Sequence, residues 1–336
     1  MNGKNWMKYL NGEKLLSAIT LPGTHDTVAT KVGLCSVGCV CQYRKITQQL
    51  EGGVRFVDIR LRHIEDIFTI HHGPIYLQTE FGKILTEVTN FLRQNNQETV
   101  VMSYQEAFAD SCKDEKCTRT YRETLKWYIN MYSSYIYKNN TIPQLKDVRG
   151  KIVLLDFEGP SAGDGFGIRS SVGFSKSSTV ANDFEPDCDP ANFINGGSKC
   201  DAYFKSLKDN MEKSKTRGSD DSRFYITYTS ANKIGTWLQG PFLYAKKFNY
   251  RVRDYLKGQY GNYGAVVMDF IFKGITPEII YGTNFRDMEL FNGGKSKCLF
   301  LLNHVFLVLD WTLIVRFLHM VSCDLHVISL IKLLSK

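Results

Sequence analysis

Residues 54–61 read VRFVDIRL, a segment of mainly branched apolar residues that is interrupted by one aspartate and two arginines. A short apolar run of this kind is typical of a strand buried in a parallel sheet. Similar runs occur at residues 17–20, 68–71, 100–104, 151–157, 224–229 and 265–271. Apolar residues recur at helical spacing between several of them, at residues 81–92 and 242–256. The alternation predicts an α/β fold, a (β/α) barrel whose chemistry lies at the carboxyl ends of the strands.

The composition indicates a folded protein with a full core. Of the 336 residues, 43% are apolar and 13% are aromatic, which is enough for one large barrel or two small domains. The formal charge of +8 arises from 42 basic and 34 acidic residues without a long run of Lys and Arg. This charge favours an anionic surface such as a membrane and does not mark a nucleic-acid site. We expect no nucleic-acid partner, and no obligate protein partner is evident.

Cysteines suggest an oxidising compartment. The chain has nine, in close groups that include Cys35, Cys39 and Cys41, then Cys112 and Cys117, then Cys188 and Cys200. Close pairs favour disulfides that staple loops, and hence a secreted or membrane-surface protein. A zinc site in the first group is the weaker alternative, because no fourth ligand is evident. Residues 1–14 lack the apolar core of a signal peptide, so a cytoplasmic location stays open.

Two regions depart from the strand and helix pattern. Residues 159–199 are rich in Gly, Ser, Asp and Asn, and we expect a long loop there. From Cys298 onward the chain becomes strongly apolar, but Asn303, His304 and Asp310 make it a poor membrane span. We therefore expect a single catalytic barrel at residues 6–290 and an apolar tail at residues 291–336. The tail is either an appended helix that packs on the protein or a membrane-associated helix.

Ionisable side chains stand at the ends of several predicted strands. His25 and Asp26 follow the first strand, Arg60 lies near the end of the second, His72 ends the third and Asp269 lies in the last. Because the carboxyl ends of barrel strands meet on one face, these five residues are expected to surround one pocket. This set of residues suits phosphoryl transfer. Two imidazoles can act as base and acid, a guanidinium can neutralise the charge that develops on a phosphorane, and carboxylates can orient the imidazoles.

Each of these residues taken singly has a simpler explanation. A His at a strand end is more often structural, and Arg60 could merely pair with Asp58 or Glu65. Asp269 is harder to explain, because a carboxylate in an apolar strand needs a partner to offset its desolvation. The joint placement on successive strands is what favours an active site.

Longer motifs carry a family resemblance. They are ITLPGTHDT, GGVRFVDIRLR, FTIHHGPIYLQTEFGKILTEVTNFLRQNNQETVVMSYQ, DVRGKIVLLDF and GAVVMDFI. In order and spacing they resemble the X domain of phosphatidylinositol-specific phospholipase C, above all the small bacterial-type enzymes, over residues 6–284. The resemblance implies a single-domain, irregular TIM (β/α) barrel. It also implies cleavage of the phosphodiester between diacylglycerol and inositol phosphate, with the inositol 2-hydroxyl as internal nucleophile.

The resemblance implies a role for each residue of the pocket. His25 looks like the general base and Asp269 like the carboxylate that orients it, while His72 looks like the general acid with Asp26 in support. Arg60 matches the phosphate-binding arginine, at a position where calcium-dependent relatives place a carboxylate. Since a guanidinium supplies positive charge and repels a cation, we expect metal-independent catalysis with no metal site and no cofactor.

Some positions depart from the family pattern. Gln105 stands where bacterial-type relatives have Lys, Asn182 and Phe184 stand where relatives show Asp and Tyr, and Phe157 replaces an Arg. We expect Gln105, Asn182 and Phe184 to contact the inositol ring. The altered positions leave open a catalytically impaired module that binds phosphoinositides. A metal-dependent phosphodiesterase on a related barrel is a further alternative, against which Arg60 argues.

A membrane contact is expected in the segment TWLQGPFLYAKKF. It brings Trp237 and Phe242 close to Lys246 and Lys247, a mixture suited to lipid headgroups. The start of an ordinary amphipathic helix is the alternative. The expected partner is phosphatidylinositol, or a glycosylated form of it, in membranes.

Overall fold

The computed structural model describes residues 2–30, 40–73, 75–107, 116–157, 166–169, 174–176, 198–231 and 240–286. These residues contain one sheet of 11 strands. The strands are β1 (Leu21–Thr24), β2 (Phe56–Ile64), β3 (Ile67–His72), β4 (Ile75–Glu80), β5 (Val100–Glu106), β6 (Ile136–Tyr137), β7 (Ile152–Asp156), β8 (Ile168–Arg169), β9 (Phe174–Lys176), β10 (Phe224–Tyr228) and β11 (Ala265–Met268).

The sheet is parallel apart from one hairpin. Its main path runs β6, β7, β5, β2, β1, β11, β10 and β9, and β8 adds to β7. All neighbours along this path are parallel. Because β1 pairs with both β2 and β11, the first and last strands lie side by side and their ends open on a common edge.

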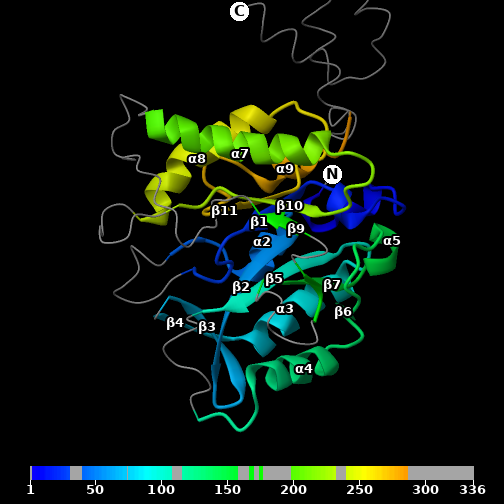
Figure 1. Ribbon diagram of the computed structural model, residues 1–336, viewed down its shortest axis with the longest axis vertical. Coiled ribbons are helices and arrows are strands. Elements are labelled where there is room, and N and C mark those ends of the chain that lie inside the picture. Colours follow the sequence, from blue (N-terminus) through cyan, green and yellow to red (C-terminus); the bar gives the residue numbers. More distant parts are fainter. Residues whose placement is uncertain are drawn as a thin grey trace, which may run out of the picture. The chain divides into compact units, whose positions relative to one another are not determined.

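Helices cover the outer face of the sheet, as the barrel prediction requires. They are α2 (Ile46–Glu51), α3 (Phe81–Gln94), α4 (Tyr121–Met131), α5 (Leu145–Val148), α7 (Ser198–Thr216), α8 (Pro241–Leu256) and α9 (Pro277–Gly282). Figure 1 shows α7, α8 and α9 grouped near β10 and β11, whereas α3 and α4 lie in the region of the earlier strands. The helices predicted at residues 81–92 and 242–256 are confirmed as α3 and α8.

Two separate apolar cores match this arrangement. Alternate residues of each strand face opposite sides of the sheet, so that Phe56 and Val101 pack in one cluster while Val57 and Val100 pack in the other. The first cluster also takes Val153, Ile226 and Val267 and fills the inside of the curled sheet, and the second packs under the helices. This layering is that of a (β/α) barrel.

The first predicted strand, at residues 17–20, is wrong in position. That segment contains the 3-10 helix η3 (Leu16–Ala18), and the strand that enters the sheet is β1. Pro22 and Gly23 normally indicate a turn, yet both lie in β1. Glycine is required there because a Cβ at Gly23 would lie 2.9 Å from a methyl group of Val267 and 3.1 Å from the Cβ of Phe56.

The prediction of a parallel strand at residues 68–71 is also wrong. β3 pairs antiparallel with β2 and with β4, so the three strands form a meander. The turn between β2 and β3 contains Glu65 and Asp66, whose φ angles of 50° and 61° suit a tight hairpin. The chain therefore runs back along β2, and His72 returns to the level of the residues near Arg60.

The amino end of the barrel is closed by the first residues of the chain. Short 3-10 helices η1 (Gly3–Asn5) and η2 (Met7–Tyr9) flank Trp6, which is fully buried and stacks on Tyr281 with ring centroids 4.9 Å apart. Below β2, the guanidinium of Arg55 lies 2.7 Å from Glu98, and both side chains are fully buried. Arg55 also donates to the carbonyl groups of Gly3 and Lys4, and Glu98 accepts from the amides of Met7 and Lys8.

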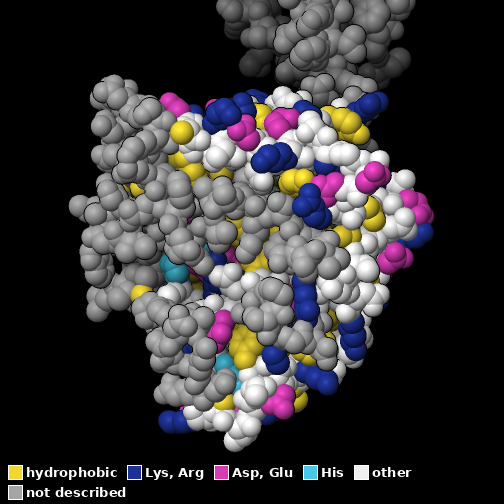
Figure 2. Space-filling model, viewed as in Figure 1, with side chains coloured by type: hydrophobic (Ala, Val, Ile, Leu, Met, Phe, Trp, Pro, Cys, Tyr) yellow, Lys and Arg dark blue, Asp and Glu magenta, His cyan; other side chains and the backbone are white. Residues whose placement is uncertain are grey.

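Several predictions fall outside the described residues. These are the tail at residues 291–336, most of the loop at residues 159–199, and Cys35, Cys39, Cys112 and Cys188. Among the helices that are described, none combines the length and apolar character needed to cross a bilayer. On the described part of the face drawn in Figure 2, basic and acidic side chains are interspersed.

Candidate active site

His25 and Asp269 form the centre of the candidate site. His25 directly follows β1, Asp269 directly follows β11, and the amide of His25 donates to the carbonyl of Met268 at 3.0 Å. Parallel pairing of the two strands thus places the side chains together, with His25 Nδ1 2.9 Å from Asp269 Oδ1. Both residues are buried, with exposed fractions of 5% and 1%. Since Nδ1 is held by the carboxylate, Nε2 is the ring nitrogen left for chemistry.

Asp26 lies between three basic groups. Its Oδ2 is 3.5 Å from His25 Nε2 and 3.5 Å from His72 Nε2, and its Oδ1 is 3.6 Å from Arg60 Nε. The backbone of Asp26 has a φ of 38°, in the left-handed region that Asp tolerates better than most residues. This conformation turns successive side chains, those of His25 and Asp26, into the same site.

Arg60 is held on two sides by carboxylates. Its Nε and one terminal nitrogen each lie 3.3 Å from Asp58 Oδ2, and Asp58 is two residues away on the same face of β2. Asp58 in turn accepts from the hydroxyl of Ser103 on β5 at 2.9 Å. The guanidinium is therefore fixed in orientation, and it is only 7% exposed.

The electrostatic balance of the site favours a charged imidazole. Burial alone would lower the pKa of His25, but the charges of Asp269, Asp26 and Asp58 and the hydrogen bond to Asp269 raise it from 6.5 to about 9. Burial raises the pKa of Asp269 despite its cationic neighbours. For Asp26, burial is outweighed by His25, His72 and Arg60, which lower its pKa. A proton taken up by His25 is therefore strongly stabilised.

The structure brings together all five residues predicted for the pocket. The contacts given above link His25, Asp26, Arg60, His72 and Asp269, and each lies in or just after the strand that was predicted to carry it. The differences are the bounds of the first strand and the antiparallel pairing of the strand that ends at His72. His72 reaches Asp26 from the end of the β3–β4 hairpin and not from a parallel strand.

The predicted inositol contacts are only partly described. Gln105 lies in β5 in register with Arg60 of β2, so the two residues are neighbours in the sheet, and Gln105 is half-buried. Asn182 and Phe184 lie outside the described residues. Phe157 immediately follows β7 and packs against the inner core as a partly buried side chain.

The predicted membrane contacts lie in or near α8. Trp237 lies outside the described residues, Lys246 is exposed, and Lys247 is half-buried. Phe242 is half-buried and packs against Phe270 and the exposed Tyr43, with ring centroids 5.3 and 5.9 Å away. This aromatic cluster adjoins the site, because Phe270 follows Asp269.

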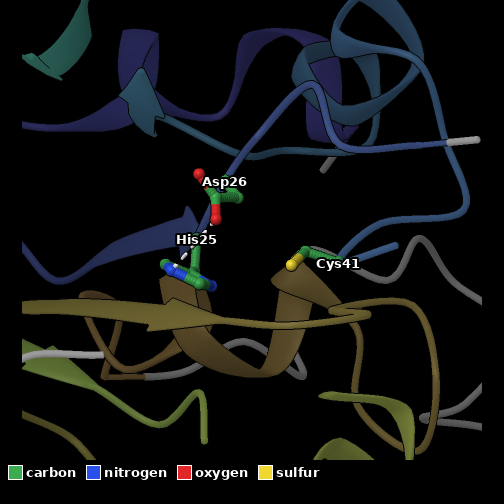
Figure 3. A group of neighbouring side chains, drawn as sticks. All are labelled: His25, Asp26 and Cys41. Atoms are coloured by element: carbon green, nitrogen blue, oxygen red, sulfur yellow. Dashed lines mark ion pairs between the residues drawn. The ribbon is translucent and has the colours of Figure 1, made fainter. Parts of the chain in front are cut away.

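Sequence reasoning missed residues that lie next to the site and support it. Gln42 donates from one nitrogen to the carbonyls of His25, at 2.9 Å, and Met268, at 2.8 Å, and so clamps the ends of β1 and β11. Cys41 is a fully buried free cysteine beside it. Figure 3 shows Asp26 and Cys41 on different sides of the His25 ring, with the sulfur of Cys41 directed toward it. The sequence indicates Asp58 only as a structural partner of Arg60, and its alternation with Arg60 along β2 is the signal that places both side chains on one face.

A buried Asp–His pair, a clamped guanidinium and a second imidazole at the open edge of a (β/α) barrel define a phosphodiester-cleaving type of barrel enzyme. The profile of the family "Phosphatidylinositol-specific phospholipase C, X domain" matches residues 19–156. A 1-phosphatidylinositol phosphodiesterase of Staphylococcus aureus (strain Newman) is 31% identical over 275 residues, which cover 76% of this chain and 83% of that protein. The chain belongs to the phosphatidylinositol-specific phospholipase C X-domain family.

Further relatives agree with this assignment. A 1-phosphatidylinositol phosphodiesterase of Listeria monocytogenes is 36% identical over 163 residues, which cover 45% of this chain and 48% of that protein. The structure of the phosphatidylinositol-specific phospholipase C of Staphylococcus aureus matches 84% of this chain and 98% of its own, with a TM-score of 0.70 and 26% identity. The Listeria monocytogenes enzyme matches 85% of this chain and 100% of its own, with a TM-score of 0.68 and 24% identity. The predicted TIM-barrel fold and family are thereby confirmed.

Proposed function

We propose that this chain is a phosphatidylinositol phosphodiesterase that releases diacylglycerol and inositol 1,2-cyclic phosphate without a metal ion. Its family membership and the names of its relatives support this activity. The observation that carries the mechanism is the 2.9 Å contact between His25 Nδ1 and Asp269. The carboxylate of Asp26 lies near both Arg60 and His72 and so joins them to this pair.

The first step uses His25 as general base. Nε2 takes the proton of the inositol 2-hydroxyl while that oxygen attacks phosphorus, and Asp269 keeps the ring in the correct tautomer. The imidazolium formed is favoured by Asp269 and Asp26, which is why the pKa of His25 is raised against the effect of burial. The same charges mean that the neutral base becomes more abundant as pH rises toward 9.

Arg60 supplies the positive charge that phosphorane formation needs. Its guanidinium donates to the non-bridging phosphate oxygens, which gain negative charge as the new P–O bond forms. Asp58 and Ser103 fix the guanidinium beforehand, so that little reorganisation accompanies the reaction. Because this charge is built into the protein, no cation is needed at that place, which supports metal-independent catalysis.

His72 completes the reaction as general acid. It gives a proton to the diacylglycerol oxygen as the old P–O bond breaks, and Asp26 Oδ2, 3.5 Å from His72 Nε2, orients the ring for this transfer. One proton is taken up by His25 and one is released by His72, so the two imidazoles must exchange protonation states before the next turnover.

The site meets its substrate at a lipid surface. The cluster of Tyr43, Phe242 and Phe270 adjoins Asp269 and includes one aromatic ring that is 60% exposed. Exposed aromatic rings suit the headgroup region of a bilayer, and the exposed Lys246 on the same helix as Phe242 suits anionic lipids. We therefore propose that the protein acts at membrane surfaces. Its closely grouped cysteines support a secreted or membrane-surface location.

The decisive experiment presents the purified protein, with EDTA, to radiolabelled phosphatidylinositol in mixed micelles. Formation of inositol 1,2-cyclic phosphate supports the proposal. Binding to the micelles without turnover indicates the impaired module, and product formation only after calcium is added indicates a metal-dependent enzyme. A His25→Ala variant is the matched control for contaminating activity.

A further inference from the structure

Cys41 has no part in the proposed reaction, yet its sulfur lies at the base of the site. One ligand atom from each of Cys41, His25 and Asp26 can be chosen so that the three lie within 4.8 Å of one another. Figure 3 shows His25 and Asp26 on the loop after β1 and Cys41 on the segment before α2, with the sulfur of Cys41 directed toward the His25 ring. All three residues are buried, with exposed fractions of 0%, 5% and 5%.

His25 presents a suitable nitrogen to this group. Nε2 is buried and makes no hydrogen bond to any described residue, although it lies 3.5 Å from Asp26 Oδ2. That separation is close to the spacing of about 3.5 Å between two ligands of a tetrahedral zinc ion. Nδ1 is bound to Asp269, and a carboxylate behind the imidazole is the usual second partner of a metal-bound His.

The charges of the site also favour a cation. The cluster holds three carboxylates, those of Asp26, Asp58 and Asp269, but one guanidinium, that of Arg60, so it is net negative whenever the imidazoles are neutral. A metal ion would replace the proton of His25 and the thiol proton of Cys41, and both protons would be released to solvent.

The ligand types select which cation can bind. A thiolate, an imidazole and one carboxylate suit Zn²⁺ or Cd²⁺, whereas Ca²⁺ and Mg²⁺ require six or more oxygen ligands or water. We propose that His25, Asp26 and Cys41 form an inhibitory site for a soft divalent cation such as Zn²⁺. A bound ion occupies the nitrogen that must accept the 2-hydroxyl proton and so blocks the base.

The inhibition rests on the proposed phosphodiesterase function, but metal binding does not. Binding is therefore measured separately, through the ultraviolet charge-transfer band that Cd²⁺ forms with a thiolate. The variants are Cys41→Ser and Cys41→Ala, which both remove the soft ligand, and Cys117→Ser as a matched control. The Cys117→Ser control is needed because ligand atoms of Cys117, His63 and Asp66 lie within 4.8 Å of one another and could bind Cd²⁺ as well.

We expect micromolar Zn²⁺, but not Ca²⁺ or Mg²⁺, to inhibit the wild-type protein, with full recovery after EDTA. Relative to the metal-free activity of each variant, the half-inhibiting Zn²⁺ concentration should rise about 10- to 100-fold in both Cys41 variants and stay unchanged in Cys117→Ser. Part of the Cd²⁺ band should disappear in the Cys41 variants.

Equal zinc sensitivity in wild type and both Cys41 variants would overturn the proposal, as would a Cd²⁺ band that the Cys41 changes leave intact. If the protein lacks phosphodiesterase activity, the loss of the Cd²⁺ band still decides whether the metal site exists. Thermal unfolding of each variant identifies any that does not fold, and the remaining Cys41 variant then carries the test.

Discussion

Replacing Asp269 by Asn tests the coupling between charge and base. The amide keeps the volume of the carboxyl group but removes the negative charge 2.9 Å from His25 Nδ1. The difference between 6.5 and about 9 in the pKa of His25 corresponds to about 3 kcal/mol in favour of the imidazolium. Asp269 is the strongest of the groups that raise this pKa, so the variant should bring it back toward or below its ordinary value.

Two measurements in the Asp269→Asn variant should change together. The rising limb of kcat/KM against pH should shift to lower pH, because a less basic His25 loses its proton earlier. At the same time kcat should fall by about 10³- to 10⁴-fold, since the amide no longer stabilises the imidazolium and can hold the ring in the wrong tautomer. Titration of the His25 ring by NMR gives the pKa independently of activity.

The matched control is Asp147→Asn, which removes one exposed carboxylate of α5 and gives the same net charge. Its pH profile should match that of the wild type. If the rising limb of kcat/KM against pH is unchanged in Asp269→Asn and activity stays within a few-fold of normal, the assignment of Asp269 and His25 as a pair is refuted.

Three further predictions concern the base, the phosphate contact and the compartment. His25→Ala should lower kcat by about 10²- to 10⁴-fold with an unchanged circular-dichroism spectrum, and near-normal turnover would remove His25 from the mechanism. Arg60→Lys should lose most activity, because an ammonium cannot reproduce the two-pronged contact with phosphate, while EDTA leaves the wild type unaffected; silencing by EDTA and rescue by Ca²⁺ would reject this assignment. Cys200 is disulfide-bonded, so intact mass of secreted protein should show two protons lost for each bridge, with Cys188 the predicted partner; free thiols throughout would favour a reducing compartment.

The polar residues of the site were accessible from the sequence because each stands at the end of an apolar run. Asp269 in particular follows four buried residues of β11, where an aspartate is unexpected without a partner. The position of His72 could be predicted, but not its route, because the pattern of β3 does not distinguish parallel from antiparallel pairing. The hairpin turn depends on the positive φ angles of Glu65 and Asp66, and the sequence has no glycine at these positions to indicate such a turn.

The missed parts depend on contacts between distant segments. Gln42 reads as a polar loop residue, and only the folded chain shows that its amide joins the ends of two strands. Cys41 looked like a member of a cysteine group, while the fold places its sulfur near His25. Strand β1 was misplaced because Pro22 and Gly23 are turn residues in most sequences, and here tight packing against Val267 requires the glycine.

The closure of the amino end of the barrel constrains the order of events during synthesis. Trp6 leaves the ribosome early, but the ring on which it stacks, Tyr281, is made near the end of the described chain. Strand β1 likewise waits for β11, its neighbour in the sheet. Contacts of such long sequence separation form slowly, and the nascent barrel must keep an open seam until its last strand is available. His25 and Asp269 lie across that same seam, so a chain that stops before Asp269 exposes apolar strands and lacks the contact on which the proposed base depends.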